Sequence, residues 1–263
     1  MSEHTLTVDG AVLSYDDRGS GPVVIVAHGL TMSRAADRKQ GLAAFEELIK
    51  DGFRVISYDA RGHGESTGRS EPADYLWSRL ADDLLALADV VSPTAPVHAV
   101  GTSMGTGTIL HALIRRPQRF RSVALTAPPT AWGTRPAQQE MYKGLAVAAE
   151  TLPRDEFAAL NSAAPAPPIF AEIWEPREPS IDMALFPSVM RGAGRSDLPA
   201  EEEVTGITVP VLLLAWATDP AHPVSTTEKL HTLLTVSEAV VAEDVASIRM
   251  WPSRVANFFT KHS

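Results

Sequence analysis

Residues 101–105, GTSMG, constrain the fold of this chain more than any other segment. They follow a mostly apolar run, residues 97–100, and lead into a helical pattern, so a buried strand, a sharp turn and a helix are predicted. In that setting the pattern G-x-S-x-G is typical of a turn that holds a serine above the edge of a sheet. Ser103 is therefore a candidate nucleophile, although a purely structural strand–turn–helix unit would show the same pattern.

Apolar runs alternate with helical patterns along most of the chain. Continuous, largely β-branched or leucine-rich runs are typical of strands covered on both faces, and they occur in PVVIVA, RVISY, VHAV, RSVALT, PVLLLAW and SEAVVA. A helix that ends before Gly52 is predicted in AAFEELIKDGF. An amphipathic helix is predicted in YLWSRLADDLLALADVV, and a closing helix in PSRVANFFTKH. The alternation predicts an α/β fold with a mostly parallel sheet and helices on both faces. AVLSYDDRGSG alternates apolar and polar residues, which indicates an antiparallel hairpin at one edge.

Residues 131–200 break this rhythm, because they are rich in proline and show short helical pieces without a convincing buried strand. We predict that they form an inserted helical cap, called the cap segment below, and that residues 1–130 and 201–263 form the core. The large apolar residues of the cap segment either build its own small core or line a ligand pocket. They are Trp132, Met141, Tyr142, Phe157, Phe170, Trp174, Met183, Phe186 and Met190.

The segment AHGL follows another predicted strand. In the strand–turn–helix setting, the backbone N–H of Leu30 could join that of Met104 to bind an oxyanion. Each such donor is worth about 3 kcal/mol in a transition state. His28 is expected to fix this loop by hydrogen bonds rather than to act as a base. The polar residues of YDARGHGES, residues 58–66, are expected to tie neighbouring loops together.

A candidate acid follows the strand predicted in PVLLLAW. Asp219, in ATDPAHPV, lies downstream of Ser103, which matches the chain order of serine, acid and histidine in one class of catalytic triad. The carboxylate in such a triad orients an imidazole and stabilises its charged form.

Together, these motifs resemble the α/β-hydrolase superfamily, in its serine-nucleophile form with a helical cap, and the resemblance covers nearly the whole chain. It implies the fold predicted above but no single reaction, since the superfamily includes esterases, lipases, lactonases, epoxide hydrolases, dehalogenases and members that catalyse no hydrolysis. A serine at position 103 argues against epoxide-hydrolase and dehalogenase chemistry, because those reactions need a carboxylate nucleophile.

The resemblance also implies a histidine base in the loop after the last strand, and there the chain departs from it. The corresponding segment, residues 244–249, reads DVASIR and contains no histidine. Of the eight histidines in the chain, His222 lies on the loop of Asp219 and is the candidate base. The alternative is that His222 only fixes this turn or contacts a substrate.

Two functions follow from these residues. In the first, the protein is a serine hydrolase that cleaves an ester, thioester or lactone of a small, partly apolar substrate, with Ser103, Asp219 and His222 as the triad and Leu30 and Met104 as oxyanion donors. In the second, the absent histidine marks a non-hydrolytic enzyme of the same fold, such as a cyclase or lyase, or a ligand-binding module. The first is favoured because the serine turn, the His-Gly loop and the acid are all present.

Composition and motifs limit the classes of binding partner and cofactor expected for this chain. The net charge of −9 argues against a nucleic acid or an anionic membrane as partner, and the absence of cysteine excludes disulfides and thiolate catalysis. No phosphate loop, dinucleotide fingerprint or metal-ligand spacing is present, so no cofactor and no metal are expected. The N-terminal MSEHTLTVDG lacks the basic and apolar regions of a signal peptide, so a cytoplasmic location is expected.

Overall fold

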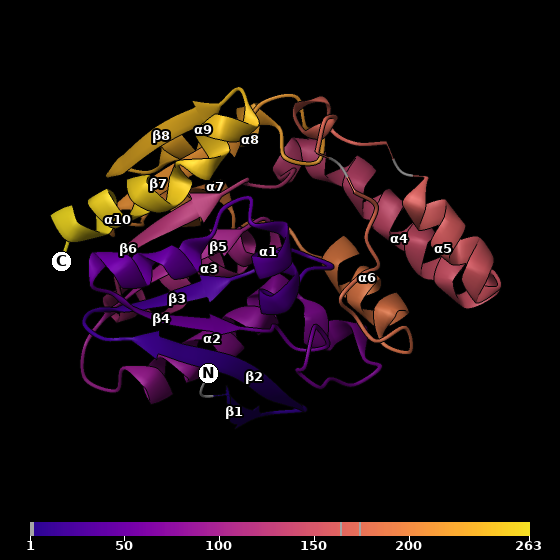
Figure 1. Ribbon diagram of the computed structural model, residues 1–263, viewed down its shortest axis with the longest axis horizontal. Helices are drawn as coiled ribbons and strands as arrows, with labels where there is room; N and C mark the ends of the chain where they lie inside the picture. The colour runs from indigo at the N-terminus through magenta and orange to yellow at the C-terminus, as the bar shows by residue number, and fades with distance from the viewer. Residues whose placement is uncertain (1–2, 164, 174) are drawn as a thin grey trace.

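A single mixed sheet runs through the molecule (Figure 1). The computed structural model describes residues 3–163, 165–173 and 175–263. Within them, eight strands pair in the order β1-β2-β4-β3-β5-β6-β7-β8. The strands are β1 (Glu3–Val8), β2 (Ala11–Gly19), β3 (Val23–Ala27), β4 (Arg54–Tyr58), β5 (Val97–Thr102), β6 (Phe120–Thr126), β7 (Val211–Trp216) and β8 (Ser237–Ala242). β2 is antiparallel to β1 and β4, whereas all other neighbours are parallel, which confirms the predicted mostly parallel sheet.

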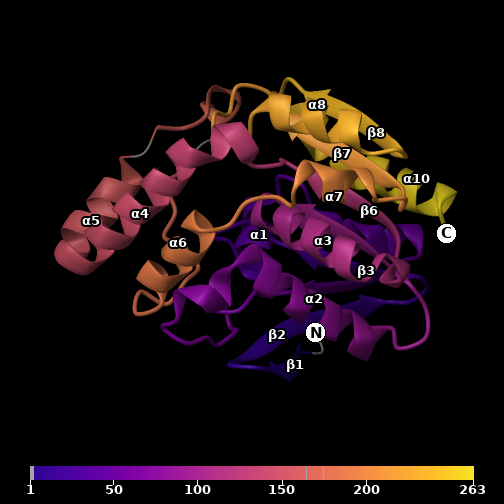
Figure 2. The same cartoon turned by 180° about the vertical axis from the view of Figure 1, so that it is seen from behind.

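Helices cover both faces of the sheet because successive side chains of each buried strand point to opposite sides. Ile25 of β3 belongs to one apolar cluster and its neighbour Val24 to the other. Figure 2 shows α2, α3 and α8 in front of the sheet, and Figure 1 shows α1 and α10 on the other face. The helices of the core are α1 (Arg34–Gln40), α2 (Trp77–Val91), α3 (Met104–Arg115), α7 (Glu201–Thr205), α8 (Val224–Leu233), α9 (Val245–Arg249) and α10 (Trp251–Lys261), with 3₁₀ turns η1 (Phe45–Asp51), η2 (Pro72–Tyr75) and η3 (Pro117–Arg119).

The chain between β6 and β7 contains the cap segment. Its helices are α4 (Arg135–Thr151), α5 (Arg154–Ser162) and α6 (Phe186–Gly194), with the 3₁₀ turns η4 (Trp132–Thr134) and η5 (Pro168–Phe170). Both views show α4, α5 and α6 beyond the end of the sheet toward which β3 points. Within the described residues, no helix combines the length and apolar character needed to cross a bilayer.

The large apolar residues of the cap segment have different surroundings. Phe157, Phe186 and Met190 are buried together in a small core of the cap, against which Tyr142 and Met183 pack. Phe170 instead belongs to the apolar cluster that contains Val24 of β3. Trp132 packs against the cluster that contains Ile25, on the opposite face of the sheet. Met141 is 47% exposed, and Trp174 lies outside the described residues.

Two local predictions differ from the structure. The helix predicted in AAFEELIKDGF is the shorter 3₁₀ turn η1, which ends at Gly52 with φ 85° as its position suggested. The helix α1, which precedes η1, is not predicted, because RAADRKQ lacks an apolar stripe. The Ser33 hydroxyl caps the start of α1 by accepting a hydrogen bond from the Ala36 N–H. The segment DVASIR forms α9 rather than an open loop, since the Asp244 carboxylate accepts a hydrogen bond from the Ser247 N–H.

Candidate active site

Ser103 occupies a strained turn between β5 and α3. Its φ is 52° and its ψ is −104°, in a region that costs a non-glycine residue on the order of 1–3 kcal/mol. The turn is held because the Ser103 N–H donates to the Thr126 carbonyl at 3.0 Å, and the Gly107 N–H donates to the Ser103 carbonyl at 3.2 Å. The strain therefore directs the Ser103 side chain away from the regular course of strand and helix.

The two glycines of the turn permit a close approach of backbones. A Cβ on Gly105 would lie 2.2 Å from the Ala27 carbonyl oxygen of β3. A Cβ on Gly101 would lie 2.5 Å from the backbone of Gly105 itself. Both distances are too short for real atoms, so the sequence pattern G-x-S-x-G is required here by contact between β3, β5 and α3.

His222 joins Ser103 to Asp219. Its Nε2 lies 2.8 Å from Ser103 Oγ, and its Nδ1 lies 2.7 Å from Asp219 Oδ2. With the ring proton on Nδ1 donated to the carboxylate, Nε2 can accept the serine hydroxyl proton. The three candidate catalytic residues thus form one chain of hydrogen bonds, although acid and imidazole come from the same loop between β7 and α8.

Asp219 is buried, and its carboxylate has three hydrogen-bond partners. Besides His222, the indole N–H of Trp216 donates to Oδ2 at 2.9 Å and the Ala221 N–H donates to Oδ1 at 2.9 Å. Burial raises the pKa of the Asp219 carboxyl, but the hydrogen bond and charge of His222, the Trp216 indole and the Ala221 amide outweigh it, and the pKa lies below its usual range. The carboxylate is therefore ionised at neutral pH.

The loop that carries acid and imidazole is anchored on several sides. The Ala217 N–H donates to the Ala242 carbonyl of β8, and the Thr130 N–H donates to the Ala221 carbonyl. From the cap segment, the Ile169 N–H donates to Thr218 Oγ1 at 3.1 Å. Positive φ angles at non-glycine residues gather near the ends of the parallel strands, at Thr31, Ser103, Ala127 and Thr218, with a further one at Trp132. Strain of this kind is typical of functional sites.

The two predicted oxyanion donors flank Ser103. Met104 is the first residue of α3, so its N–H belongs to the helix turn whose amides lack partners within the helix. A Cβ on Gly29 would lie 3.7 Å from Ser103 Cβ, so the His-Gly loop passes beside the serine, and Leu30 follows on that loop. The structure thus brings both residues to the site.

His28 and His63 lie near the serine loop but are engaged elsewhere. The His28 ring accepts from the Ala60 N–H at 2.9 Å and bonds the Gly29 carbonyl at 2.8 Å. His63 Nδ1 lies 2.9 Å from the Arg61 carbonyl. Burial lowers the pKa of His28 to about 4 and that of His63 to about 3. These two imidazoles are therefore neutral and fix loops, as their motifs suggested.

The charged residues of YDARGHGES are also used for structure. Asp59 accepts the Arg34 N–H on Oδ1 at 2.8 Å and the Glu65 N–H on Oδ2 at 3.0 Å. Arg61 donates two hydrogen bonds of 2.7 Å to the buried carboxylate of Asp83 on α2. This segment therefore ties β4 to α1 and α2.

Comparison with known proteins agrees with the geometry. The model of a family described as alpha/beta hydrolase fold matches residues 22–164, more than half of the chain. The chain belongs to the α/β-hydrolase fold family. The solved enol-lactonase from Burkholderia xenovorans LB400 superposes on it with a TM-score of 0.78 and 24% identity, over 98% of this chain and 100% of that one.

Curated relatives of this α/β hydrolase match over a part of their length. An epoxide hydrolase of Caballeronia sordidicola is 28% identical over 123 residues, which are 47% of this chain and 36% of the relative. A bifunctional esterase/perhydrolase of Acinetobacter calcoaceticus is 32% identical over 130 residues, which are 48% of this chain and 45% of the relative. The α/β hydrolase described here thus spans less than half the length of each.

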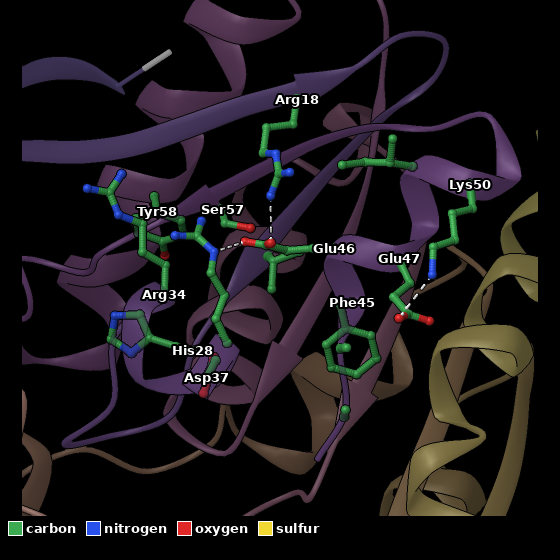
Figure 3. Close-up of a pocket in the computed structure, with 15 residues that line it drawn as sticks. Arg18, His28, Arg34, Asp37, Phe45, Glu46, Glu47, Lys50, Ser57 and Tyr58 are labelled. Carbon is green, nitrogen blue, oxygen red and sulfur yellow. Dashed lines mark hydrogen bonds and ion pairs between the residues drawn. The ribbon is translucent and has the colours of Figure 1, made fainter. Parts of the chain in front are cut away.

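A separate cavity of about 380 Å³ lies between α1, η1 and the sheet (Figure 3). Its lining includes Val26, His28 and Phe45 but none of Ser103, Asp219 or His222. Glu46 lies at its centre, bonded to Arg18 at 2.9 Å and also to the guanidinium of Arg38. This cavity is distinct from the candidate active site of the α/β hydrolase.

Trp216 is the site residue that sequence reasoning overlooked. It ends β7 and is only 9% exposed, and its indole N–H reaches Asp219. A buried tryptophan usually needs a partner for its N–H, and the acid three residues later was an available acceptor in the sequence. That spacing was the signal by which Trp216 could have been found.

Proposed function

We propose that the protein is a serine hydrolase that cleaves an ester, thioester or lactone of a small, partly apolar substrate. The observation that carries this proposal is the 2.8 Å separation of Ser103 Oγ and His222 Nε2. A serine hydroxyl is a weak nucleophile unless a base within hydrogen-bond reach takes its proton. His222 meets that geometric requirement, and its Nδ1 is hydrogen-bonded to the Asp219 carboxylate.

The chemistry proceeds in two halves. Ser103 Oγ attacks the carbonyl carbon of the substrate while His222 Nε2 takes the hydroxyl proton, and the carbonyl oxygen becomes an oxyanion. His222 then gives the proton to the leaving alcohol or thiol, and the C–O or C–S bond breaks to leave an acyl group on Ser103. A water molecule repeats the sequence on the acyl group, with His222 again as base, and releases the acid.

The oxyanion is bound by the N–H groups of Leu30 and Met104. Met104 heads α3, so the positive end of the helix dipole also favours negative charge at this point. The two amides come from loops fixed by the hydrogen bonds of His28 and by the close packing of Gly105 on β3. Donors that are fixed before the reaction need no reorganisation when the charge develops.

An apolar portion of the substrate is supported by the surroundings of Leu30. Its side chain packs against the main apolar cluster and against the cap cluster that contains Phe186 and Met190. Apolar surface therefore adjoins the oxyanion loop where the cap segment meets the core. Ser103 in place of an aspartate also supports an acyl substrate rather than an epoxide or alkyl halide.

The alternative, a non-hydrolytic enzyme or a binding module of the same fold, rested on the missing histidine after the last strand. It would have been favoured by a serine without an imidazole nearby. The imidazole of His222 at 2.8 Å supports the hydrolase instead.

The proposal is tested by trapping the acyl-enzyme. The folded protein is incubated with p-nitrophenyl esters of two to eight carbons, quenched in acid, and digested for mass spectrometry. We expect release of p-nitrophenol and an added acyl mass on the peptide that contains Ser103. Ser103→Ala is expected to show neither.

Thr102→Ser is a suitable control variant, because it alters the adjacent residue while keeping the hydroxyl that bonds Thr126. It should retain both signals. Hydrolysis that survives Ser103→Ala unchanged, or a folded wild-type protein that releases no product from any ester, thioester or lactone offered, would contradict the proposal.

A further inference from the structure

Trp216 is bonded to the acid of the candidate triad on the oxygen that His222 uses. Its indole N–H donates to Asp219 Oδ2 at 2.9 Å, and His222 Nδ1 faces the same oxygen at 2.7 Å. We propose that Trp216 is a positioning residue whose indole N–H fixes the Asp219 carboxylate, and through it the orientation of the His222 ring toward Ser103. This inference rests on the proposed hydrolase function and identifies a further residue on which it depends.

The need for such a residue follows from the placement of acid and imidazole on one loop. The His222 N–H donates to the Asp219 carbonyl at 3.1 Å, so the two residues are the ends of a tight turn. A carboxylate on a short turn can still rotate about its terminal bond. Apart from His222, one donor holds each oxygen, with the Ala221 N–H on Oδ1 and the Trp216 indole on Oδ2. Two donors on two oxygens fix the plane of the carboxylate.

The indole can serve as a fixed donor because neighbouring aromatic rings restrict the rotation of its plane. The ring of Trp251 lies parallel to it at an interplanar angle of 2° and a centroid distance of 5.6 Å. Phe170 of the cap segment meets it edge-on at 4.9 Å, and His222 meets it edge-on at 5.4 Å. Trp216 is therefore packed from α10, from the cap segment and from the imidazole that it helps to orient.

Through Trp251, the C-terminal segment packs against the tryptophan that contacts the acid of the candidate triad. Trp251 lies two residues beyond the stretch, residues 244–249, in which the family resemblance places a histidine and in which this chain has none. The segment thus contributes packing rather than a base: Trp251, 1% exposed, supports Trp216, which holds Asp219. A triad with both acid and imidazole on the β7 loop is supported by an aromatic stack from the end of the chain.

A titratable group of the cap segment also interacts with Asp219. It is Tyr142 of α4, which interacts electrostatically with the Asp219 carboxylate. Burial raises the pKa of Tyr142, which Arg135 opposes and the Asp219 charge increases, so this hydroxyl stays neutral around neutral pH.

The rate of Ser103 modification by a fluorophosphonate tests the inference without knowledge of the natural substrate. The second-order rate is measured from pH 5 to pH 9 for the wild type, Trp216→Phe and Trp77→Phe. We expect Trp216→Phe to react about ten- to hundredfold more slowly, the size expected for loss of a hydrogen bond to a charged group. The lower limb of its pH profile should move to higher pH, because the carboxylate charge is then shared by one fewer donor.

Trp77→Phe is the matched control, since Trp77 is also buried and its indole N–H has no partner among the described residues. It should keep the wild-type rate and midpoint. A Trp216→Phe protein with the wild-type midpoint, whatever its rate, contradicts the positioning role. A folded wild type that is never labelled contradicts the hydrolase proposal itself, so the two failures are distinct.

A measurement on the wild type covers the case in which Trp216→Phe does not fold or the serine does not react. The five indole N–H resonances are followed by NMR as the pH is varied, together with the ring protons of His222. We expect one indole resonance to shift with the midpoint of the His222 ring. If no indole resonance follows that midpoint, Trp216 does not sense the pair and the inference is wrong.

Discussion

His222 Nδ1 lies 2.7 Å from Asp219 Oδ2, and only two residues separate them in the sequence. Acid and imidazole therefore share one loop, and their distance is set locally by the turn that joins them. The link to Ser103 is long-range, because β5 and β7 must end at the same edge of the sheet with β6 between them. The site thus combines a local pair with a single long-range contact of 2.8 Å.

Asp219→Asn should disable the base while the fold is retained. An amide can no longer hold the proton of His222 on Nδ1, so the tautomer that leaves Nε2 free is lost. We expect the rate of fluorophosphonate labelling at Ser103 to fall by about a thousandfold or more. Asp244→Asn is the control, because asparagine begins a helix as well as aspartate does and Asp244 begins α9. Equal labelling of the two variants would contradict the role of Asp219.

Gly105→Ala should destabilise the protein through contact with β3. The added Cβ would lie 2.2 Å from the Ala27 carbonyl oxygen, and overpacking of this kind costs about 1–3 kcal/mol. Gly144→Ala is the matched control, since a Cβ there has no atom within 4 Å and alanine favours a helix interior by about 0.5–1 kcal/mol. Urea denaturation should give free energies of unfolding that change in opposite directions. A Gly105→Ala protein as stable as the wild type would contradict the close approach at Gly105.

Most of the core was predictable because its sequence signals are local. The parallel strands are uninterrupted apolar runs, and α2 shows its stripe at three- and four-residue steps, with Leu80, Leu84 and Leu87 all buried. α1 was missed because a short helix with four charged residues has no apolar periodicity. The segment 43–53 was assigned to a regular helix although it forms a 3₁₀ turn, a distinction that side-chain spacing alone does not make.

The candidate site was predictable in its residue types but not in its supports. Ser103 and Asp219 were found from their places after strands, and His222 from its place on the loop of the acid. Their catalytic roles stay predictions. The contact of Trp216 with Asp219 depends on how an indole turns at the end of β7, and the packing of Trp251 on Trp216 joins segments far apart in the chain. The three-residue spacing of Trp216 and Asp219 allows their contact, but no pattern in the sequence fixes the orientation of these side chains.

The buried imidazole of His63 should make stability depend on pH in a defined direction. Burial, with a small contribution from the proximity of His28, lowers its folded-state pKa to about 3, below the unfolded value of 6.5. The unfolded chain therefore binds a proton that the folded protein does not, and stability is lost as the pH falls below 6.5 toward 3. The loss from this one group is about 1.4 kcal/mol for each pH unit inside that window.

His63→Asn isolates this effect, since an amide can still donate to the Arg61 carbonyl but does not titrate. Urea denaturation of both proteins at pH 7.5, 6.0, 5.0 and 4.5 gives the difference in free energy of unfolding. We expect the wild type to lose its advantage over the variant progressively below pH 6.5. A difference that is constant over this range would show that His63 takes up a proton in the folded protein as readily as in the unfolded chain.

The account depends most on His222 acting as the base for Ser103 from the loop of the acid. The direct measurement is the rate at which a fluorophosphonate labels Ser103 in the wild type, in His222→Gln and in His231→Gln, whose exposed imidazole bonds Ser237. We predict that His222→Gln reduces the rate by about a thousandfold or more, while His231→Gln reacts like the wild type. Labelling of folded His222→Gln at the wild-type rate would contradict the account.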